Sequence, residues 1–272
     1  MINDTSLARA FWEKGRADDC PVYDMHGHMG PFSGIWFPRP SSEGMIQAMD
    51  RAGVRLLCFT PHDALFAPEV GNATSIEAVR KFPDRLRAYV AINPHYPEFV
   101  ARDIAMFEKH TDVFVGVKLL SDYHTVPMTA AAYEPALKFA DERKLLVLAH
   151  TWGASLFNGT DACRTVARRY PNIAFLLGHS LHGAWDDAIA VAREFPNVYL
   201  ELCALLDNNR GVLEKFVEAG LSERMLFGTD LPWFAPHCGI GAILSADVTD
   251  EDRHRILHRN AQKLLSRFAG LT

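Results

Sequence analysis

The chain of 272 residues lacks several features that would assign it to a specialised class of protein. It has no apolar run near the ~18 residues that a membrane-spanning helix needs, and no block of like charge. With 28 basic and 33 acidic residues, the net charge is −5 and the pI is about 6.2. Nucleic-acid-binding domains are usually basic, so we expect neither nucleic acid nor membrane as a partner. The first twenty residues mix both charges and do not resemble a secretory signal, which predicts a cytoplasmic protein.

The sequence also lacks paired cysteines. Its five cysteines are odd in number, widely spaced and free of any Cys-x-x-Cys pair: Cys20, Cys58, Cys163, Cys203 and Cys238. This pattern predicts neither a disulfide framework nor a zinc site made of cysteine pairs, and we expect reduced, mostly buried thiols. Histidine is plentiful instead, with twelve residues.

The hydrophobic content of 49% is enough for a large globular core. Eight short segments rich in β-branched and large apolar residues recur along the chain, with helix-like stretches between them. They cover residues 21–28, 55–60, 86–93, 113–120, 145–151, 173–180, 197–204 and 225–232. Strand and helix alternating eight times is typical of a (β/α)8 TIM barrel. A doubly wound sheet would favour a glycine-rich phosphate loop after the first strand, and none is present.

Local signals predict where some helices begin and end. Thr74 and Glu77 form a capping box that predicts a helix starting there, and Gly53 predicts the end of an earlier helix. The last outer helix is expected from about Asp250. No linker divides the chain, so we predict one barrel domain over residues 1–272, with residues 1–20 as a helical lead-in.

Polar residues stand at the ends of four predicted strands. His26 and His28 end the first strand, His150 the fifth and His179 the sixth, and Asp230 follows the eighth. TIM barrels place their chemistry at the carboxyl ends of the strands, so these side chains should meet. His26 and His28 are two residues apart and should face the same way on a strand, where both can reach one cation. A nitrogen-rich set with one carboxylate suits zinc or another late divalent metal better than magnesium or calcium.

These motifs resemble the amidohydrolase superfamily, and more narrowly its amidohydrolase-related branch, which includes aminocarboxymuconate-semialdehyde decarboxylase. The resemblance runs from Asp24 to Leu265 and rests on five ordered motifs: Asp-x-His-x-His, His-Thr, Gly-His, Gly-Thr-Asp and Asn-Ala-x-x-Leu-Leu. It implies a metallo-dependent hydrolase type of barrel. It also implies that His26, His28, His150 and Asp230 hold one divalent metal, while His179 and Asp230 act in catalysis.

Lys118, near the end of the fourth predicted strand, has more than one interpretation. In binuclear amidohydrolases a carboxylated lysine bridges two metals, so a second metal is expected only if Lys118 is carboxylated. Otherwise Lys118 can pair with a substrate carboxylate. Zinc is the first expectation for the metal, with manganese and iron as alternatives.

Other residues are expected around the pocket or away from it. We predict substrate contacts from Arg39, Trp36, His124, Trp152 and His182. The aromatic residues Phe32, Trp233 and Phe234 are expected as pocket walls, and Asp24 is expected to fix the first strand. His62 is expected in a solvated loop, and His254 and His258 on the outer surface of a helix. Short loops after the strands predict a small substrate. A substrate that pairs with Lys118 or Arg39 would be anionic.

Three functions remain open at this point. The first is a metal-dependent hydrolase of a small amide, lactone or ester, in which the metal lowers the pKa of bound water towards ~7 and Asp230 takes its proton. The second is a metal-dependent, non-oxidative decarboxylase of a small unsaturated or aromatic carboxylate. The third is a non-catalytic metal-binding barrel, which has no need for an acid at Asp230. The sequence leaves the substrate and any homo-oligomeric state open.

Overall fold

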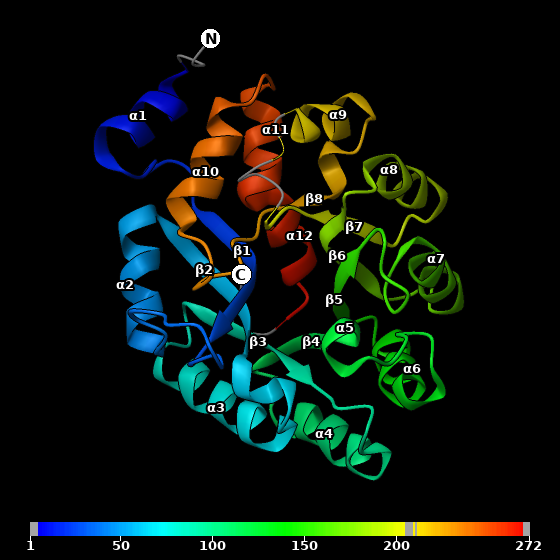
Figure 1. The fold of residues 1–272 in the computed structure, drawn as a ribbon. Helices are drawn as coiled ribbons and strands as arrows, with labels where there is room; N and C mark the ends of the chain where they lie inside the picture. Colours follow the sequence, from blue (N-terminus) through cyan, green and yellow to red (C-terminus); the bar gives the residue numbers. More distant parts are fainter. Residues whose placement is uncertain (1–4, 205–208, 210, 269–272) are drawn as a thin grey trace.

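The computed structural model describes residues 5–204, 209 and 211–268, and in them eight parallel strands alternate with helices (Figure 1). The strands are β1 (Val22–Met29), β2 (Val54–Pro61), β3 (Leu86–Ala91), β4 (Phe114–Leu119), β5 (Leu146–Trp152), β6 (Ala174–His182), β7 (Val198–Glu201) and β8 (Met225–Leu226). They pair in the order β1 to β8 in one sheet. This arrangement confirms the predicted (β/α)8 barrel, and all eight predicted segments overlap a strand.

The barrel closes between β1 and the chain that follows β8. The backbone N–H of Met25 donates to the carbonyl of Phe227 at 2.9 Å, and that of Asp230 donates to the carbonyl of His26 at 2.7 Å. A further bridge joins Gly27 to Leu231. These bonds hold the backbone of Asp230 next to that of His26, although the two residues are far apart in the sequence.

Helices surround the barrel and cover its outer face (Figure 1). They are α2 (Ser42–Ala52), α3 (Pro68–Lys81), α4 (Pro97–Lys109), α6 (Glu134–Glu142), α7 (Thr160–Arg169), α8 (Trp185–Glu194), α9 (Val212–Glu218), α10 (Pro236–Ser245) and α11 (Asp250–His254), with the short α5 (Ser121–His124) after β4. Strands β3 and β4 are buried along their whole length, and β5 is buried up to half-buried Trp152. This burial is expected of parallel strands that are covered on both faces.

Two of the predicted helix boundaries are confirmed and one is wrong. Gly53 ends α2 in the left-handed conformation, with φ at 77°, and Thr249 caps α11 just before Asp250. The capping box at Thr74 does not start a helix, because α3 already begins at Pro68. Proline suits the first turn of a helix, and the Thr74 hydroxyl donates to the carbonyl of Val70 within it.

The amino-terminal end of the barrel is closed by the last helix of the chain. After α11 the helix passes through a π-helical turn (Arg255–Arg259) into α12 (Asn260–Leu265). Leu264 and Leu265 pack among inward-facing strand residues such as Met25 and Leu148. We call this end the floor of the barrel and the opposite end, where the strands finish, the mouth.

The amino-terminal segment lies outside the ring of strands. Helix α1 (Ser6–Lys14) packs against α10, and the ring of Trp12 lies over Gly241. The predicted lead-in of residues 1–20 has its first four residues outside the described part of the chain. Among the described helices, none has the length and apolar character needed to cross a membrane.

Candidate active site

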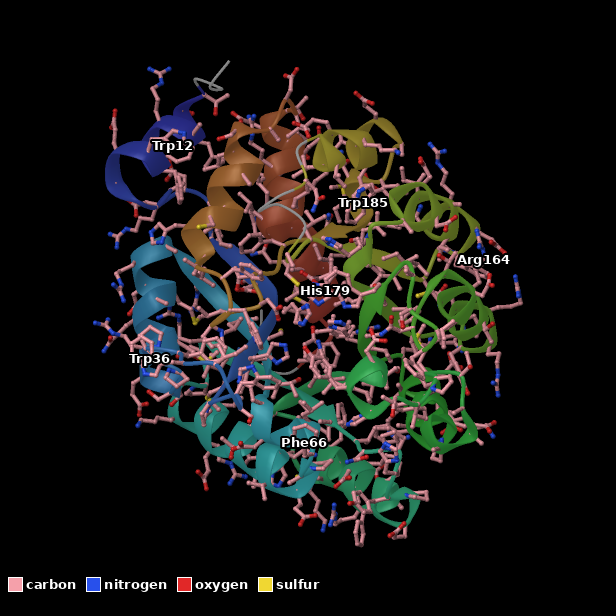
Figure 2. The ribbon with its side chains drawn as sticks, in the orientation of Figure 1. Trp12, Trp36, Phe66, Arg164, His179 and Trp185 are labelled. Carbon is pink, nitrogen blue, oxygen red and sulfur yellow. The ribbon has the colours of Figure 1, made fainter. Side chains whose placement is uncertain are left out.

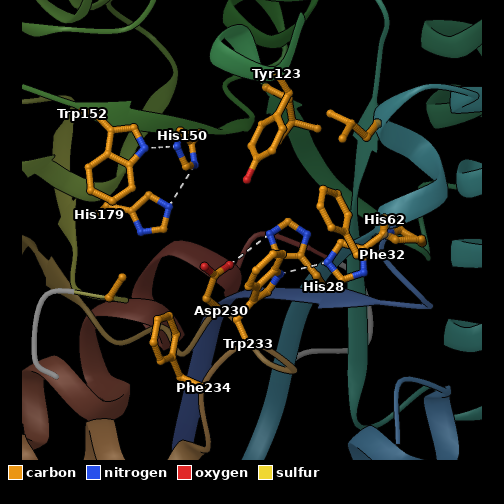
Figure 3. Close-up of a pocket in the computed structure, with 14 residues that line it drawn as sticks. His28, Phe32, His62, Tyr123, His150, Trp152, His179, Asp230, Trp233 and Phe234 are labelled. Atoms are coloured by element: carbon orange, nitrogen blue, oxygen red, sulfur yellow. Dashed lines mark hydrogen bonds and ion pairs between the residues drawn. The ribbon is translucent and has the colours of Figure 1, made fainter. Parts of the chain in front are cut away.

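A cavity of about 210 Å³ opens at the mouth of the barrel (Figure 3). Aromatic rings form much of its wall, from Phe32, Tyr123, Trp152, Trp233 and Phe234. Polar groups at or just after strand ends also line it: His28, His62, His150, His179 and Asp230. Drug-sized ligands usually occupy ~300–1,000 Å³, so this cavity suits a smaller molecule.

The two histidines of β1 are held by their second ring nitrogens. The Nδ1–H of His26 donates to Glu201 Oε2 at 2.8 Å, and the Nδ1–H of His28 donates to the carbonyl of Thr60 at 3.0 Å. A hydrogen bond of this kind fixes the tautomer and leaves the lone pair on Nε2. Burial lowers the pKa of His26 well below its usual value, so its ring stays neutral.

Asp230 presents its carboxylate to both of these histidines. Its Oδ1 lies 3.1 Å from Nε2 of His28 and 3.6 Å from Nε2 of His26. Burial opposes the ionisation of Asp230, but the neighbouring histidines outweigh it and hold the pKa of Asp230 well below its usual range. The backbone of Asp230 is in the left-handed region, with φ at 61°. The carboxylate is thus fixed between two imidazoles.

The donor atoms of His26, His28 and Asp230 all lie within 4.8 Å of one another, as the ligands of one metal ion must. Asp230 Oδ1 is buried and has no hydrogen-bond partner among the described residues. A buried carboxylate oxygen without a hydrogen bond is costly, and a cation bound to it removes that cost. Two imidazole nitrogens and one carboxylate oxygen therefore fit a divalent transition metal.

His150, the fourth predicted ligand, lies beside His179 instead. The indole N–H of Trp152 donates to His150 Nε2, and the Nδ1–H of His150 donates to His179 Nε2 at 3.0 Å. The Trp152 ring also stacks on His179, with centroids 5.3 Å apart (Figure 3). Burial lowers the pKa of His150 well below its usual value and that of His179 to about 4, so both rings are neutral.

Lys118 reaches the same group of residues from β4. Its Nζ lies 2.6 Å from His26 Nε2, and the side chain is only 1% exposed. Burial lowers the pKa of Lys118 to about 8 against the opposing effects of Asp230, Cys203 and Glu201. The lysine thus approaches the nitrogen of His26 that faces Asp230.

Two further residues, at the end of β7, belong to this group although no sequence motif predicts them. Glu201 is fully buried and accepts the hydrogen bond from His26, and Cys203 Sγ lies 3.0 Å from His26 Nδ1 and 3.1 Å from His179 Nδ1. Burial raises the pKa of Glu201 and, more strongly, that of the Cys203 thiol. A glutamate inside an otherwise apolar strand was the available signal in the sequence.

Asp24 holds β1 to the segment after β8, as expected. Its carboxylate accepts the backbone N–H of His26 at 3.1 Å, and both the N–H and the hydroxyl of Thr229. The expectation that His62 is solvated is wrong. His62 is 7% exposed, stacks on His28 with centroids 5.0 Å apart and accepts the indole N–H of Trp233 at 3.0 Å.

Of the five residues predicted to contact substrate, the structure places Trp152 in the cavity wall. Trp36 is 83% exposed and lies at the edge of the molecule, far from His179 in Figure 2. Arg39 bonds to Gln47 on the surface, and buried His124 bonds to Tyr133 and to the carbonyl of Leu65. His182 packs behind Trp152, with centroids 4.5 Å apart. Among the five, Trp152 is the one that lines this cavity.

Comparisons with known proteins agree with this fold. A family model described as amidohydrolase matches residues 23–267. No curated protein sequence matches the chain significantly. Among solved structures, a 2,6-dihydroxybenzoate decarboxylase in complex with 2,6-dihydroxybenzoate is similar with a TM-score of 0.74 and 14% identity, covering 91% of this chain and 99% of the other.

Two further similar structures contain manganese. A dihydroxybenzoic acid decarboxylase from a Polaromonas species, with the inhibitor 2-nitroresorcinol, has a TM-score of 0.73 and 17% identity, covering 91% of this chain and 98% of the other. A 5-carboxyvanillate decarboxylase from Novosphingobium aromaticivorans, with 4-hydroxy-3-methoxy-5-nitrobenzoic acid, has a TM-score of 0.72 and 13% identity, covering 92% and 97%. At such identities the likeness concerns the fold.

Proposed function

The chain belongs to the amidohydrolase family and is an enzyme, and from that premise we propose that it is a metal-dependent, non-oxidative decarboxylase of a small aromatic carboxylate. The observation that carries the proposal is the cavity itself. Aromatic rings line a small space, and the groups that can ligate a metal, among them His28 and Asp230, line it too. The similar structures named above are decarboxylases of hydroxylated benzoates, which favours decarboxylation over the hydrolysis expected first from the sequence.

We infer that His26, His28 and Asp230 hold the divalent metal. His150 would join them only by turning away from His179, and a bridging role for Lys118 would need a carboxylated side chain. When bound, the metal supplies positive charge that orients an anionic substrate and stabilises negative charge developing on it. The two nitrogens and one oxygen suit both zinc and the manganese found in the similar structures.

Asp230 is the proposed proton donor to the ring. A substrate carboxylate beside Asp230 raises its proton affinity, because like charges disfavour ionisation. The ring carbon that bears the carboxylate takes the proton from the Asp230 oxygen other than Oδ1, because Oδ1 would bind the metal. The bond from that carbon to the carboxylate then breaks, its electron pair returns to the ring and CO2 leaves. Asp230 regains a proton from water, so protons and charge balance over the cycle.

The neutral pair of His150 and His179 would bind the polar substituents of the ring. Both imidazoles face the cavity, and Trp152 fixes their orientation through the hydrogen bond to His150. Lys118 adds positive charge next to His26. Phe32, Tyr123 and Trp233 would exclude water from the rest of the ring. We also infer that residues 1–272 work as one catalytic domain.

The test is a panel of substrates given to the protein loaded with manganese or zinc. CO2 release would be measured from hydroxylated benzoates and from unsaturated aliphatic carboxylates, and acid or amine release from lactones, esters and amides. We expect CO2 from at least one hydroxylated benzoate and none after removal of the metal with a chelator. Hydrolysis of a lactone or amide without any CO2 release would restore the hydrolase interpretation.

A further inference from the structure

A second group of metal-ligating side chains lies at the floor of the barrel, away from the cavity. It consists of Cys20, in the turn before β1, and of His254 and His258, around the junction of α11 with the π-helical turn. Because Cys20 precedes β1, the group sits where the strands begin, whereas the cavity lies where they end. The expectation that His254 and His258 point outward is wrong for His258, which is 9% exposed.

The three donor atoms are close enough to share one ion. They all lie within 4.8 Å of one another, and His254 Nδ1 is 3.0 Å from His258 Nε2. Ligands in a tetrahedral zinc site, bound at ~2.0–2.3 Å, are about 3.3–3.8 Å apart. Side-chain adjustments below an ångström or so would therefore bring all three into place.

Neighbouring groups already orient one of the ligands. The Nδ1–H of His258 donates to Gln262 Oε1 at 3.0 Å, which leaves the lone pair on Nε2, the atom that faces His254. A polar partner on the second nitrogen is the usual support of a metal-binding histidine. The two histidines are four residues apart across a π-helical turn, a rare distortion that is frequent at functional sites.

The surrounding charges allow a cation. Burial raises the pKa of the Cys20 thiol to about 12. The charge of Arg259 lowers this pKa, and the charge of Asp250 raises it. A metal would displace the thiol proton, as zinc does in other cysteine sites. The guanidinium of Arg259 pairs with Glu251 at 2.6 Å, which offsets its positive charge.

We propose that Cys20, His254 and His258 bind one zinc ion at the floor of the barrel. A thiolate with two imidazoles suits zinc, and half-buried His254 lets water reach the fourth position. The ion would tie the segment before β1 to the helix that closes the floor, so its role would be to stabilise the fold. It would take no part in the reaction at the mouth.

The test uses the full chain, stripped of metal and reloaded with cobalt, whose thiolate complexes show a charge-transfer absorption band. We expect this band in the unmodified protein and its loss in Cys20→Ser. Cys203→Ser is the matched control, because Cys203 is the cysteine next to the histidines of the mouth. A band that persists in Cys20→Ser and disappears in Cys203→Ser would show that the thiolate ligand is at the mouth, and it would overturn the proposal.

A second measurement does not depend on how a buried cysteine variant folds. His254→Gln changes a half-buried side chain, and we expect it to bind one zinc equivalent fewer per chain than the unmodified protein. At a zinc concentration about 100-fold above the dissociation constant, the floor site should raise Tm by about 5–10 °C. Equal zinc content in both proteins, or a rise in Tm that His254→Gln keeps in full, would show that no zinc binds there.

Discussion

The mouth and the floor of the barrel are built from the same eight strands, but they hold different kinds of side chain. The mouth gathers buried imidazoles and carboxylates around a cavity, whereas the floor packs Leu264 and Leu265 of α12 against Met25, Leu56 and other inward-facing residues. Buried ionisable groups cost stability unless they are paired, and apolar packing supplies it. On the proposed function, the chain separates reactivity from stability along the barrel axis.

The backbone shows the same division. Most of the described non-glycine residues with positive φ lie at the mouth, among them His179 (65°), Ser180 (49°), Leu181 (53°), Ala204 (55°) and Asp230 (61°), whereas Lys144 (56°) lies at the floor end. Each such residue costs about 1–3 kcal/mol and persists only where its surroundings enforce it. The enforcement is visible at Asp230, whose N–H is bonded to His26 and whose neighbour Thr229 is bonded to Asp24. Substitutions at the two ends should thus separate activity from stability.

The largest effect is expected from Asp230→Asn at the mouth. Asparagine keeps the shape and tolerates positive φ, but it cannot donate a carboxylic proton, so turnover should fall by about 10²–10⁴-fold. The free energy of unfolding should change little by comparison, because removal of a buried charge and loss of its contacts with the histidines have opposite effects. Turnover of the metal-loaded protein and its Tm are the two measurements.

Asp63→Asn is the matched control for this substitution, because Asp63 is exposed and lies just beyond the end of β2. It should leave turnover unchanged. Equal losses in the two variants would mean that Asp230 has no special part in the reaction.

Leu265→Ala at the floor should produce the opposite pattern. The side chain is fully buried, and its truncation should lower the free energy of unfolding by about 2–5 kcal/mol. Turnover per folded molecule should not change, because the substitution is at the other end of the barrel. Lys263→Ala, on the exposed side of the same helix, should be close to neutral. A large fall in turnover at a temperature where Leu265→Ala is fully folded would contradict the separation.

Glu201→Gln should weaken the metal site by an intermediate amount. The carboxylate accepts the Nδ1–H of His26, and an amide in its place can present N–H to the same atom and favour the wrong tautomer. Loss of such a supporting partner typically costs about 10–100-fold in metal affinity. Competition with a coloured chelator measures the affinity, and Glu218→Gln, exposed on α9, is the control that should retain it.

The smallest effect is expected from Lys144→Gly, at the floor end between α6 and β5. Lys144 is exposed, with φ at 56°, and glycine removes the ~1–2 kcal/mol penalty of that conformation while adding ~0.5–1 kcal/mol of chain entropy. A net stabilisation of about 0.5 kcal/mol should raise Tm slightly without altering turnover. Lys144→Ala keeps the penalty and should show no gain. An equal rise in Tm in both variants would show that relief of the positive φ is not the cause of the stabilisation.

The sequence predicted the barrel and the end at which His26, His28 and Asp230 meet, because both depend on periodic, local patterns. Alternation along a strand places His26 and His28 together, and the barrel topology carries Asp230 to them. The position of His150 was less predictable, since its hydrogen bonds to Trp152 and His179 depend on side-chain rotamers.

The sequence does not predict side-chain contacts that depend on the conformation of a loop. Trp36 and Arg39 were expected at the cavity because they follow β1, but the loop turns them to the surface. Glu201 and Cys203 were missed because a single acid or thiol in an apolar strand has no spacing pattern. Their roles depend on β7 lying next to β6 and close to β1 across the barrel, which only the folded chain displays.

Isotope incorporation tests whether Asp230 protonates the ring carbon from which CO2 departs. A substrate that releases CO2 would be turned over in D2O by the metal-loaded protein, and the product would be examined by NMR. We expect one deuterium per molecule, at the carbon that carried the carboxylate, and formation of this product about 10²–10⁴-fold more slowly with Asp230→Asn. Deuterium-free product, or undiminished turnover by Asp230→Asn, would show that Asp230 does not protonate the ring.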